Sequence, residues 1–249
     1  MDLQELVENN WADSAENYSH IVQKELDSFK KKAWAELILE SAPPKEKLDI
    51  LDVGTGPGFF AIILTLAGHN VTAVDCTGEM IAYARENARR SGVQPTFHVM
   101  DSHSLNFEEE SFDLIVSRNV TWTLRDAEAA YREWKRVLRP DGRILIFDAN
   151  WNLRFFDEEY RRKFEEDERA YMEKYGEKAR LDKHGEKMDD FRRSMPMNSR
   201  LRPQWDFDAL IRTGFKKIYC NVDIGARVWD EAERLKYRSR PMFMLAVEK

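Results

Sequence analysis

The sequence predicts an α/β protein in which a mostly parallel sheet carries helices on both faces. Between residues 48 and 148, short apolar runs alternate with helical patterns, as expected for repeated strand–helix–strand units. The same alternation returns from Phe207 onward. The chain has 249 residues, of which 43% are hydrophobic, so it is long enough for one large domain with a sizeable core.

The expected core of the domain spans residues 45–149 and 206–249. Glycines and prolines at the ends of the apolar runs set the element boundaries. We expect strands over 48–53, 70–75, 96–100, 112–117, 142–148, 215–224 and 241–247. We expect helices over 59–67, 79–91, 127–138 and 207–213.

Two further segments flank this core. Residues 1–44 are expected to be helical, because apolar residues recur every three or four positions from Ile21 through Phe29 to Leu37 and predict one buried face. Residues 150–205 form a charged insertion in which Phe156, Tyr160, Phe164, Tyr171 and Tyr175 share one helical stripe. Two compatible interpretations stay open: a solvated helix that packs its stripe on the domain, or a lid over a pocket.

Composition excludes several classes of protein. Cys76 and Cys220 lie far apart, which argues against a disulfide scaffold, a redox pair or a cysteine-based zinc site, and we expect no metal. No apolar run approaches the roughly 20 residues that span a bilayer, and the first residues do not have the pattern of a secretory signal, so we expect a cytoplasmic protein without a membrane partner. The formal charge of −6 argues against nucleic acid as a partner.

A glycine-rich turn is the first feature that indicates chemistry. The strand at 48–53 leads into Gly54, Gly56 and Gly58 and then into a helix, whose N-terminus offers free N–H groups to an anionic group. Phe59 replaces the last glycine of the dinucleotide fingerprint, and the phosphate-loop ending is absent. Asp52 would repel a pyrophosphate and suits a cationic ligand. These features together favour an aminoacyl nucleoside.

Two acidic residues follow the next strands. Asp75 ends the second strand, where its carboxylate can accept hydrogen bonds from both hydroxyls of a ribose; the alternative is a helix N-cap. Asp101 follows the third strand and can accept from an adenine amine, while the backbone N–H of Ser102 can donate to a ring nitrogen. The alternative for Asp101 is an ordinary surface turn.

The chain at this point resembles the class I S-adenosylmethionine-dependent methyltransferases, in particular those that modify small molecules. The resemblance is carried by LDVGTGPGFFAI, VTAVD, EMIAYARENA, VMDSHSLNFEEESFDLIVSRNVTWTL and EWKRVLRPDGRILIFD, in that order. It extends to the C-terminal strands and leaves out the charged insertion. It implies a Rossmann-like seven-stranded sheet with the last strand antiparallel, and S-adenosyl-L-methionine as cofactor.

The resemblance also implies roles for individual residues. The glycines would hold the methionine part of the cofactor, Asp75 the ribose and Asp101 the adenine, with Met80 packed on the adenine face or, alternatively, only in the core. Asn119 would contact the methionine amine or the acceptor, and Tyr18 the methionine carboxylate. The full expected cofactor set is Asp52, Gly54, Gly56, Gly58, Asp75, Cys76, Met80, Asp101, Ser102, Asn119 and Tyr18.

The acceptor is less constrained by the sequence. The resemblance implies that the insertion caps the substrate, and the expected acceptor-binding residues are Trp11, Trp122, Tyr160 and Tyr171. The alternative for Trp122 is that it simply anchors the next helix in the core. Four arginines of the insertion are candidates to bind an acidic group: Arg192, Arg193, Arg200 and Arg202. Single histidines are usually structural, so no catalytic residue is assigned.

The predicted function is methyl transfer to an N, O or S atom of a small soluble molecule. The alternatives are a methyltransferase acting on RNA or protein, or a non-catalytic nucleoside-binding module. The tetrapeptide Asn-Pro-Pro-Tyr, typical of some of the former, is absent from residues 117–122, and the intact glycine turn and ribose acid argue against the latter.

Overall fold

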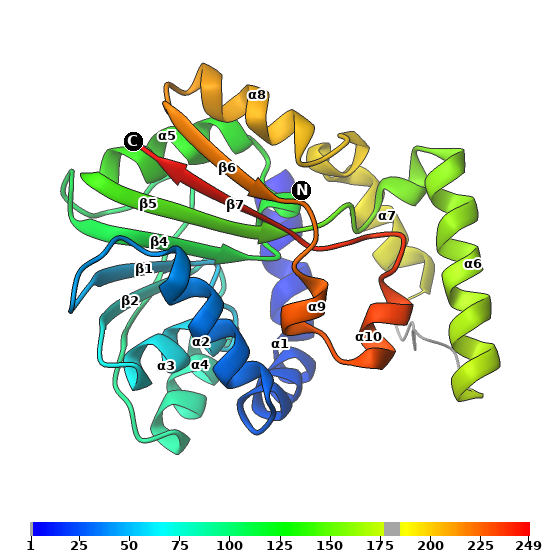
Figure 1. Cartoon of the computed structure of the whole chain (residues 1–249), viewed down its shortest axis with the longest axis horizontal. Coiled ribbons are helices and arrows are strands. Elements are labelled where there is room, and N and C mark those ends of the chain that lie inside the picture. Colours follow the sequence, from blue (N-terminus) through cyan, green and yellow to red (C-terminus); the bar gives the residue numbers. More distant parts are fainter. Residues whose placement is uncertain (1, 177–184) are drawn as a thin grey trace.

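A twisted seven-stranded sheet forms the centre of the molecule (Figure 1). The computed structural model describes residues 2–176 and 185–249. The strand order is β3-β2-β1-β4-β5-β7-β6, and β7 alone runs antiparallel to its neighbours β5 and β6. The strands are β1 (Asp49–Val53), β2 (Asn70–Asp75), β3 (Thr96–Val99), β4 (Phe112–Arg118), β5 (Leu138–Asp148), β6 (Lys217–Asn221) and β7 (Phe243–Glu248). The predicted fold class is thus confirmed.

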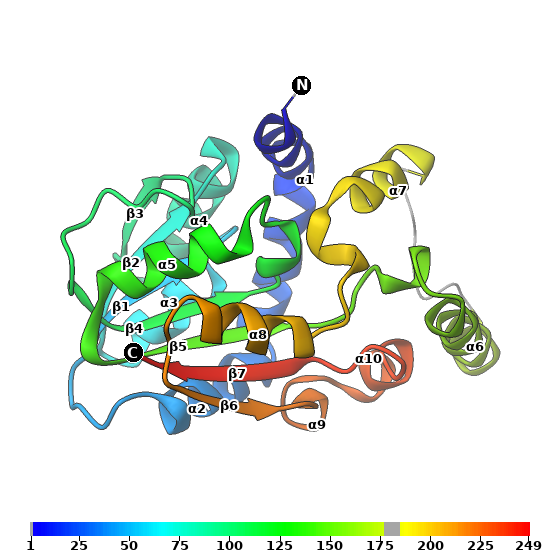
Figure 2. The same ribbon diagram turned by 90° about the horizontal axis from the view of Figure 1, so that it is seen from above.

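Helices cover both faces of the sheet (Figure 2). On one face, α2 (Lys30–Ser41), α3 (Phe59–Leu66) and α4 (Gly78–Arg90) enclose a core centred on Trp34, Phe60 and Phe147. On the other face, α5 (Ala127–Val137) and α8 (Gln204–Arg212) pack Trp134 and Leu210 on the sheet. Because both faces are buried, the central strands are continuous apolar runs, as parallel strands typically are.

The N-terminal segment consists of α1 (Leu3–Leu26) and α2, separated by a break at residues 27–29. The expectation of one buried face from Ile21 to Leu37 is wrong in part, because Ile21 and Phe29 are 44% and 51% exposed. The break rotates α2 relative to α1, so the spacing does not continue through it. Helix α1 packs on α4, where Asn87 Nδ2 donates to Ser19 Oγ at 3.1 Å.

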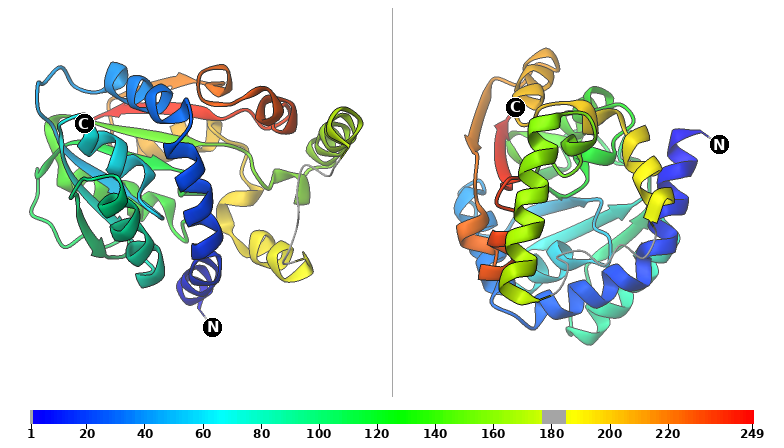
Figure 3. Two further views of the ribbon diagram at one scale, coloured as in Figure 1. Left: turned by 90° about the horizontal axis from the view of Figure 1, so that it is seen from below. Right: turned by 90° about the vertical axis from the view of Figure 1, so that its right-hand side faces the viewer.

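The insertion contains η2 (Leu153–Phe155), α6 (Glu158–Tyr175), α7 (Gly185–Ser194) and η3 (Pro196–Ser199). Helix α6 stands away from the sheet (Figure 3) and packs on η2 and α10 (Glu231–Lys236). Its buried contact is polar: Asp167, 1% exposed, accepts from the Ser239 amide at 2.7 Å and from Arg238 Nε at 3.0 Å. The predicted aromatic stripe is only half-buried in its middle, and Phe156 and Tyr175 at its ends are exposed.

Two other predicted elements differ from the structure. β5 begins at Leu138 rather than Gly142, because residues between Leu138 and Arg143 form an irregularity that β4 accommodates by a register shift. The strand predicted over 215–224 is shorter, and it is followed by α9 (Gly225–Val228) and α10, which the sequence did not predict. Among the described helices, none has the length and apolar character needed to cross a membrane.

Candidate cofactor and acceptor site

A cavity of about 660 Å³ opens at the carboxyl ends of the parallel strands, where ligands bind in open α/β sheets. One set of lining residues, numbered 4–124, comes from α1 and from the turns after β1 to β4; we call it the N-terminal lining. The other, numbered 151–240, comes from the insertion and the segment leading to β7; we call it the C-terminal lining. The C-terminal lining consists of Trp151, Asn152, Glu168, Met188, Arg192, Lys236, Tyr237 and Arg240.

The glycine turn is fixed to the neighbouring strands. The amides of Gly54 and Thr55 both donate to the Val74 carbonyl, at 2.8 and 3.0 Å. A Cβ at Gly54 would lie 2.3 Å from Val120 Cγ2, and its φ of +68° suits glycine. The turn thus lies directly against the ends of β2 and β4, which only glycine permits.

The other two glycines have different surroundings. Gly56 lines the cavity, and a Cβ there would meet nothing nearer than Met80 Sδ at 4.0 Å. Gly58 does not line the cavity; a Cβ there would lie 3.1 Å from Ala84 Cβ. The expectation that Gly58 contacts the methionine part is therefore not supported by its position. Its missing side chain instead lets α3 approach α4 closely.

Asp52 lies at the end of β1, buried beneath the turn and still part of the cavity wall. One oxygen, Oδ2, accepts from Thr55 Oγ1 at 2.6 Å and from the Ala61 amide at 3.1 Å. Burial raises the pKa of Asp52 to about 7, although these hydrogen bonds oppose the shift. A buried carboxyl whose ionisation is costly is well suited to a cationic ligand that would compensate the charge.

Asp75 connects the glycine turn to the start of α4. Its Oδ2 accepts from the Gly56 amide at 2.9 Å, and its Oδ1 accepts from the amide and hydroxyl of Thr77 at 3.1 and 3.0 Å. Burial raises the pKa of this carboxyl as well. Asp75 can hold the glycine turn and bind a ligand at the same time, because a carboxylate has about four acceptor positions and three are used here.

Asp101 is held by two side chains at the edge of the cavity. Its Oδ1 accepts from the amide of His103 at 2.9 Å and faces His103 Nδ1 at 2.8 Å, and its Oδ2 contacts Arg125 at 2.5 Å. Burial acts in the opposite direction, but these contacts hold its pKa below the usual range. Arg125 also contacts Gln4 of α1. Asp101 is therefore no ordinary surface turn residue: it joins β3 to the N-terminal helix.

The remaining predicted cofactor residues also line the cavity. Cys76 and Met80 follow Asp75, and Ser102 follows Asp101. Asn119, with φ +60°, follows β4, and its amide donates to the Phe147 carbonyl at 2.8 Å. Tyr18 packs edge-on against Trp11 with ring centroids 5.3 Å apart.

Aromatic rings form part of the cavity wall. Trp122 packs edge-on against Trp11 and Phe191, with ring centroids 5.8 and 6.0 Å away. Trp151 and Tyr237, 5.3 Å apart, add a second pair that sequence reasoning missed. No local motif marks these two, because β5 and α10 bring them together only through the tertiary fold.

Tyr160 and Tyr171 do not line the cavity, contrary to expectation. The Tyr171 ring packs against Tyr175 at 4.7 Å, and the Tyr160 ring lies beside Lys163. Helix α6 reaches the cavity through Glu168 instead, because its contacts with η2 and α10 hold the tyrosines elsewhere. Of the four candidate arginines, Arg192 alone is part of the cavity wall.

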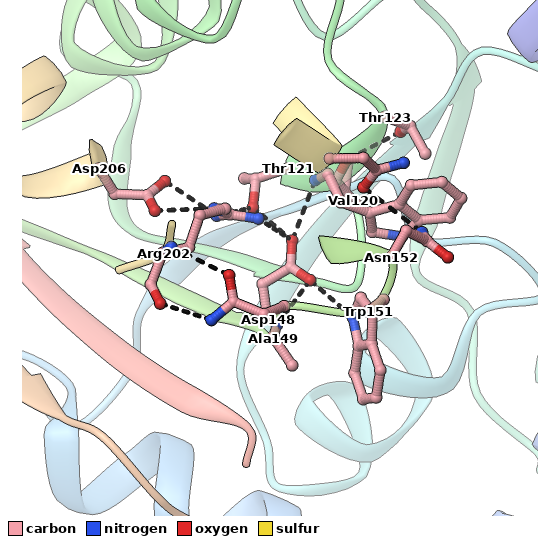
Figure 4. A network of polar contacts seen from close by, with 12 residues as sticks. Val120, Thr121, Thr123, Asp148, Ala149, Trp151, Asn152, Arg202 and Asp206 are labelled. Atoms are coloured by element: carbon pink, nitrogen blue, oxygen red, sulfur yellow. Dashed lines mark hydrogen bonds and ion pairs between the residues drawn. The ribbon is translucent and has the colours of Figure 1, made fainter. Parts of the chain in front are cut away.

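Arg202 belongs to a buried ionic network rather than to the cavity (Figure 4). Its Nε lies 2.7 Å from Asp206 Oδ2, and its Nη1 lies 2.9 Å from Asp148 Oδ2. All three side chains are almost completely buried. The expectation that Arg202 binds an acidic ligand is thus wrong, because two carboxylates of the protein already occupy it.

Asp148 connects this network to the cavity wall. Its Oδ2 accepts from the Trp122 amide at 3.0 Å, and its Oδ1 accepts from Trp151 Nε1 at 2.8 Å (Figure 4). Arg202 and Asn150 also join the two ends of the insertion, since the Arg202 amide donates to Asn150 Oδ1 at 2.9 Å. The network therefore positions both tryptophans.

Residues 51–146 match the family model described as a methyltransferase domain. This range contains the glycine turn, Asp75 and Asp101. This segment of the chain is a methyltransferase domain of the class I S-adenosylmethionine-dependent family. The seven-stranded sheet and the cavity at its carboxyl edge are those that the family resemblance implies.

Curated relatives match this chain over part of its length. It is 34% identical over 113 residues to the uncharacterized methyltransferase YcgJ of Bacillus subtilis, covering 45% of each chain. It is 36% identical over 110 residues to a malonyl-[acyl-carrier protein] O-methyltransferase of Erwinia pyrifoliae, covering 44% of this chain and 40% of the relative. The match thus spans less than half the length of each relative.

Solved structures share the fold over nearly the whole chain. A candidate S-adenosyl-L-methionine-dependent methyltransferase of Methanococcus maripaludis has a TM-score of 0.63 at 20% identity, covering 96% of this chain and 93% of that one. Phosphoethanolamine N-methyltransferase 2 of Haemonchus contortus, in complex with S-adenosyl-L-methionine, has a TM-score of 0.59 at 18% identity, covering 87% and 52%.

Proposed function

We propose that the protein transfers the methyl group of S-adenosyl-L-methionine to an N, O or S atom of a small molecule. The observation that carries this proposal is one cavity wall on which Gly56, Asp52 and Asp75 lie together at the ends of β1 and β2. Membership of the methyltransferase family supports it.

The described residues fit the cofactor. Gly56 leaves open the space that a Cβ would fill, so the methionine part can approach the backbone closely. The buried Asp52 carboxyl suits a cationic group, and Asp75 retains an acceptor position for a ribose hydroxyl. Asp101 would bind the adenine side, and Asn119 and Tyr18 the methionine side.

When bound, the cofactor would supply a methyl group on a positively charged sulfur that leaves as a neutral thioether, and a protonated acceptor would release its proton to solvent. The protein's contribution is to align the acceptor and exclude water. The rings of Trp11 and Trp122 line the cavity, where they would exclude water, and aromatic faces tolerate a positive charge without hydrating it.

Isothermal calorimetry with S-adenosylhomocysteine tests the cofactor assignment, and we expect saturable binding at one site per chain. A screen of metabolite pools with radiolabelled S-adenosylmethionine then tests the transfer. Binding without transfer to any small molecule would favour the nucleoside-binding alternative, and label found in RNA or protein would favour a macromolecular acceptor. Absence of binding would reject the proposed function.

A further inference from the structure

The two linings of the cavity contain different sets of charged side chains. The N-terminal lining contains Asp52, Asp75 and Asp101, and its one arginine, Arg118, is paired with Glu25 at 2.8 Å. The C-terminal lining contains three cations and a single acid among the described residues: Arg192, Lys236, Arg240 and Glu168. Because a cavity wall of one sign focuses the field on ligands of the other, the two linings favour different ligand groups.

Arg192 is held in place by its surroundings. It is 9% exposed, and its Nη1 lies 2.7 Å from Asp189 Oδ1 within α7. The Arg192 carbonyl accepts from Asn198 Nδ2 at 2.7 Å, and Asn198 Oδ1 accepts from Asn152 Nδ2 at 3.4 Å. Asn152 itself lines the cavity, so the insertion fixes this guanidinium at the wall.

Arg240 and Lys236 approach the cavity from the segment that precedes β7. The Arg240 guanidinium lies over the rings of Phe164 and Tyr237, at 4.4 and 5.3 Å, and Lys236 Nζ lies 5.3 Å from the Tyr237 ring. Arg240 Nη2 also donates to the Lys236 carbonyl at 2.7 Å. Stacking of this kind preorganises an arginine, so less conformational freedom is lost when it binds an anion.

Glu168 is the acidic residue of the C-terminal lining and lies on α6. Its Oε1 is buried, and no hydrogen bond reaches it from the part of the chain that the structure describes. A buried polar atom without a partner is costly, so a donor group on a ligand in the cavity would remove that cost.

We propose that the methyl acceptor carries a compact anionic group, a carboxylate or a phosphate, which binds among Arg192, Lys236 and Arg240. An N–H or O–H of the same molecule donates to Glu168, and its apolar body lies against Trp151 and Tyr237. This inference rests on the proposed function, since it names the substrate class of that site.

The experiment measures probe binding to the protein saturated with S-adenosylhomocysteine. Phenyl phosphate, phenylacetate and phenylacetamide are titrated at one fixed ionic strength, so that charge is compared on the same ring. We expect at least one anion to bind about tenfold or more tightly than the neutral amide, the scale of a charge-assisted hydrogen bond. The anion that binds more tightly shows whether the anionic group of the acceptor is a phosphate or a carboxylate.

Variants assign the effect to the C-terminal lining. Arg240→Gln and Lys236→Gln are each expected to weaken the preferred anion about tenfold, while S-adenosylhomocysteine affinity changes less than twofold. Arg200→Gln is the matched control: it removes the same charge from an exposed position that does not line the cavity. Lys236 is only half-buried, so its variant remains informative if Arg240→Gln does not fold.

Equal binding of the amide and both anions would overturn the acceptor proposal, and so would equal losses in Lys236→Gln and Arg200→Gln. Either result, with S-adenosylhomocysteine still bound, leaves the proposed function intact. Failure of the wild-type protein to bind S-adenosylhomocysteine would instead reject the proposed function together with the subsite that rests on it.

Discussion

The two linings of the cavity are built in different ways. In the N-terminal lining, Asp52 accepts from the Ala61 amide of α3, and Asp75 accepts from the amides of Gly56 and Thr77. In the C-terminal lining, Trp151 and Tyr237 come from segments far apart in the chain, and the Asp148–Arg202 pair secures one of them. The carboxylates at the ends of β1 and β2 are thus fixed by the turns around them, whereas the C-terminal lining depends on contacts between distant segments, so different substitutions should disturb each.

The largest effect is expected from breaking the network that supports the C-terminal lining. Arg202→Met leaves the buried carboxylates of Asp148 and Asp206 without their cation, which should lower the free energy of unfolding by about 3–5 kcal/mol. Urea unfolding at pH 7 measures it. Arg200→Met is the control, because Arg200 is exposed two residues away. Equal effects of the two variants would show that the network does not stabilise the fold.

A pH-dependent effect is expected on the N-terminal lining. Because burial raises the pKa of Asp52 to about 7, the ligand-free folded state binds more protons than the unfolded state between about pH 4 and 7. Wild-type stability therefore falls as the pH rises through this window. Asp52→Asn keeps an acceptor oxygen for Thr55 and Ala61 and removes the titration.

The stability advantage of Asp52→Asn over wild type should grow by about 2–3 kcal/mol from pH 5 to pH 8 in urea unfolding of the ligand-free protein. Asp141→Asn, in an exposed position, serves as the control and should show a constant difference. A difference for Asp52→Asn that stays constant across the same range would mean that Asp52 titrates normally.

A smaller effect is expected on the affinity for S-adenosylhomocysteine, which should depend on the N-terminal lining. Asp75→Ala should weaken S-adenosylhomocysteine by about 1–3 kcal/mol, that is, roughly 10- to 100-fold, because both the ligand contact and the Gly56 anchor are lost. Calorimetry measures it. Asp157→Ala removes another carboxylate that accepts from a main-chain amide, at the start of α6 and outside the cavity, and should leave the affinity unchanged. Similar losses in both variants would remove Asp75 from the site.

This difference between the linings also explains what the sequence could predict. The alternation of apolar runs with helical patterns predicts the sheet and its parallel strands up to β5. Together with the glycine turn, it also predicts that Asp52, Asp75 and Asp101 lie at strand ends. The sequence does not distinguish a glycine of this turn that lines the cavity from one that packs against a helix. The prediction therefore places Gly58 at the ligand, whereas in the structure it packs against Ala84.

The C-terminal lining could not be predicted in the same way. Arg202 and Arg192 are both arginines of one charged segment, yet one is buried between carboxylates and the other lines the cavity. Spacing along the chain does not carry this distinction, because it depends on where Asp148 and Asp206 lie after folding. Long-range tertiary contacts likewise place Trp151, Tyr237 and Arg240 at the cavity wall.

The smallest effect is expected on α6, whose tyrosines do not line the cavity. Tyr160→Ala should change the affinity of the S-adenosylhomocysteine complex for its preferred anionic probe by less than about twofold, the usual range for a residue that makes no ligand contact. Trp151→Ala is the comparison, because its ring is part of the cavity wall and its loss should weaken the probe more strongly. Calorimetry with the probe measures both. An equally large loss in Tyr160→Ala would mean that α6 moves over the cavity when ligands bind, so that the insertion acts as a lid and the C-terminal lining of the loaded protein includes the tyrosine stripe.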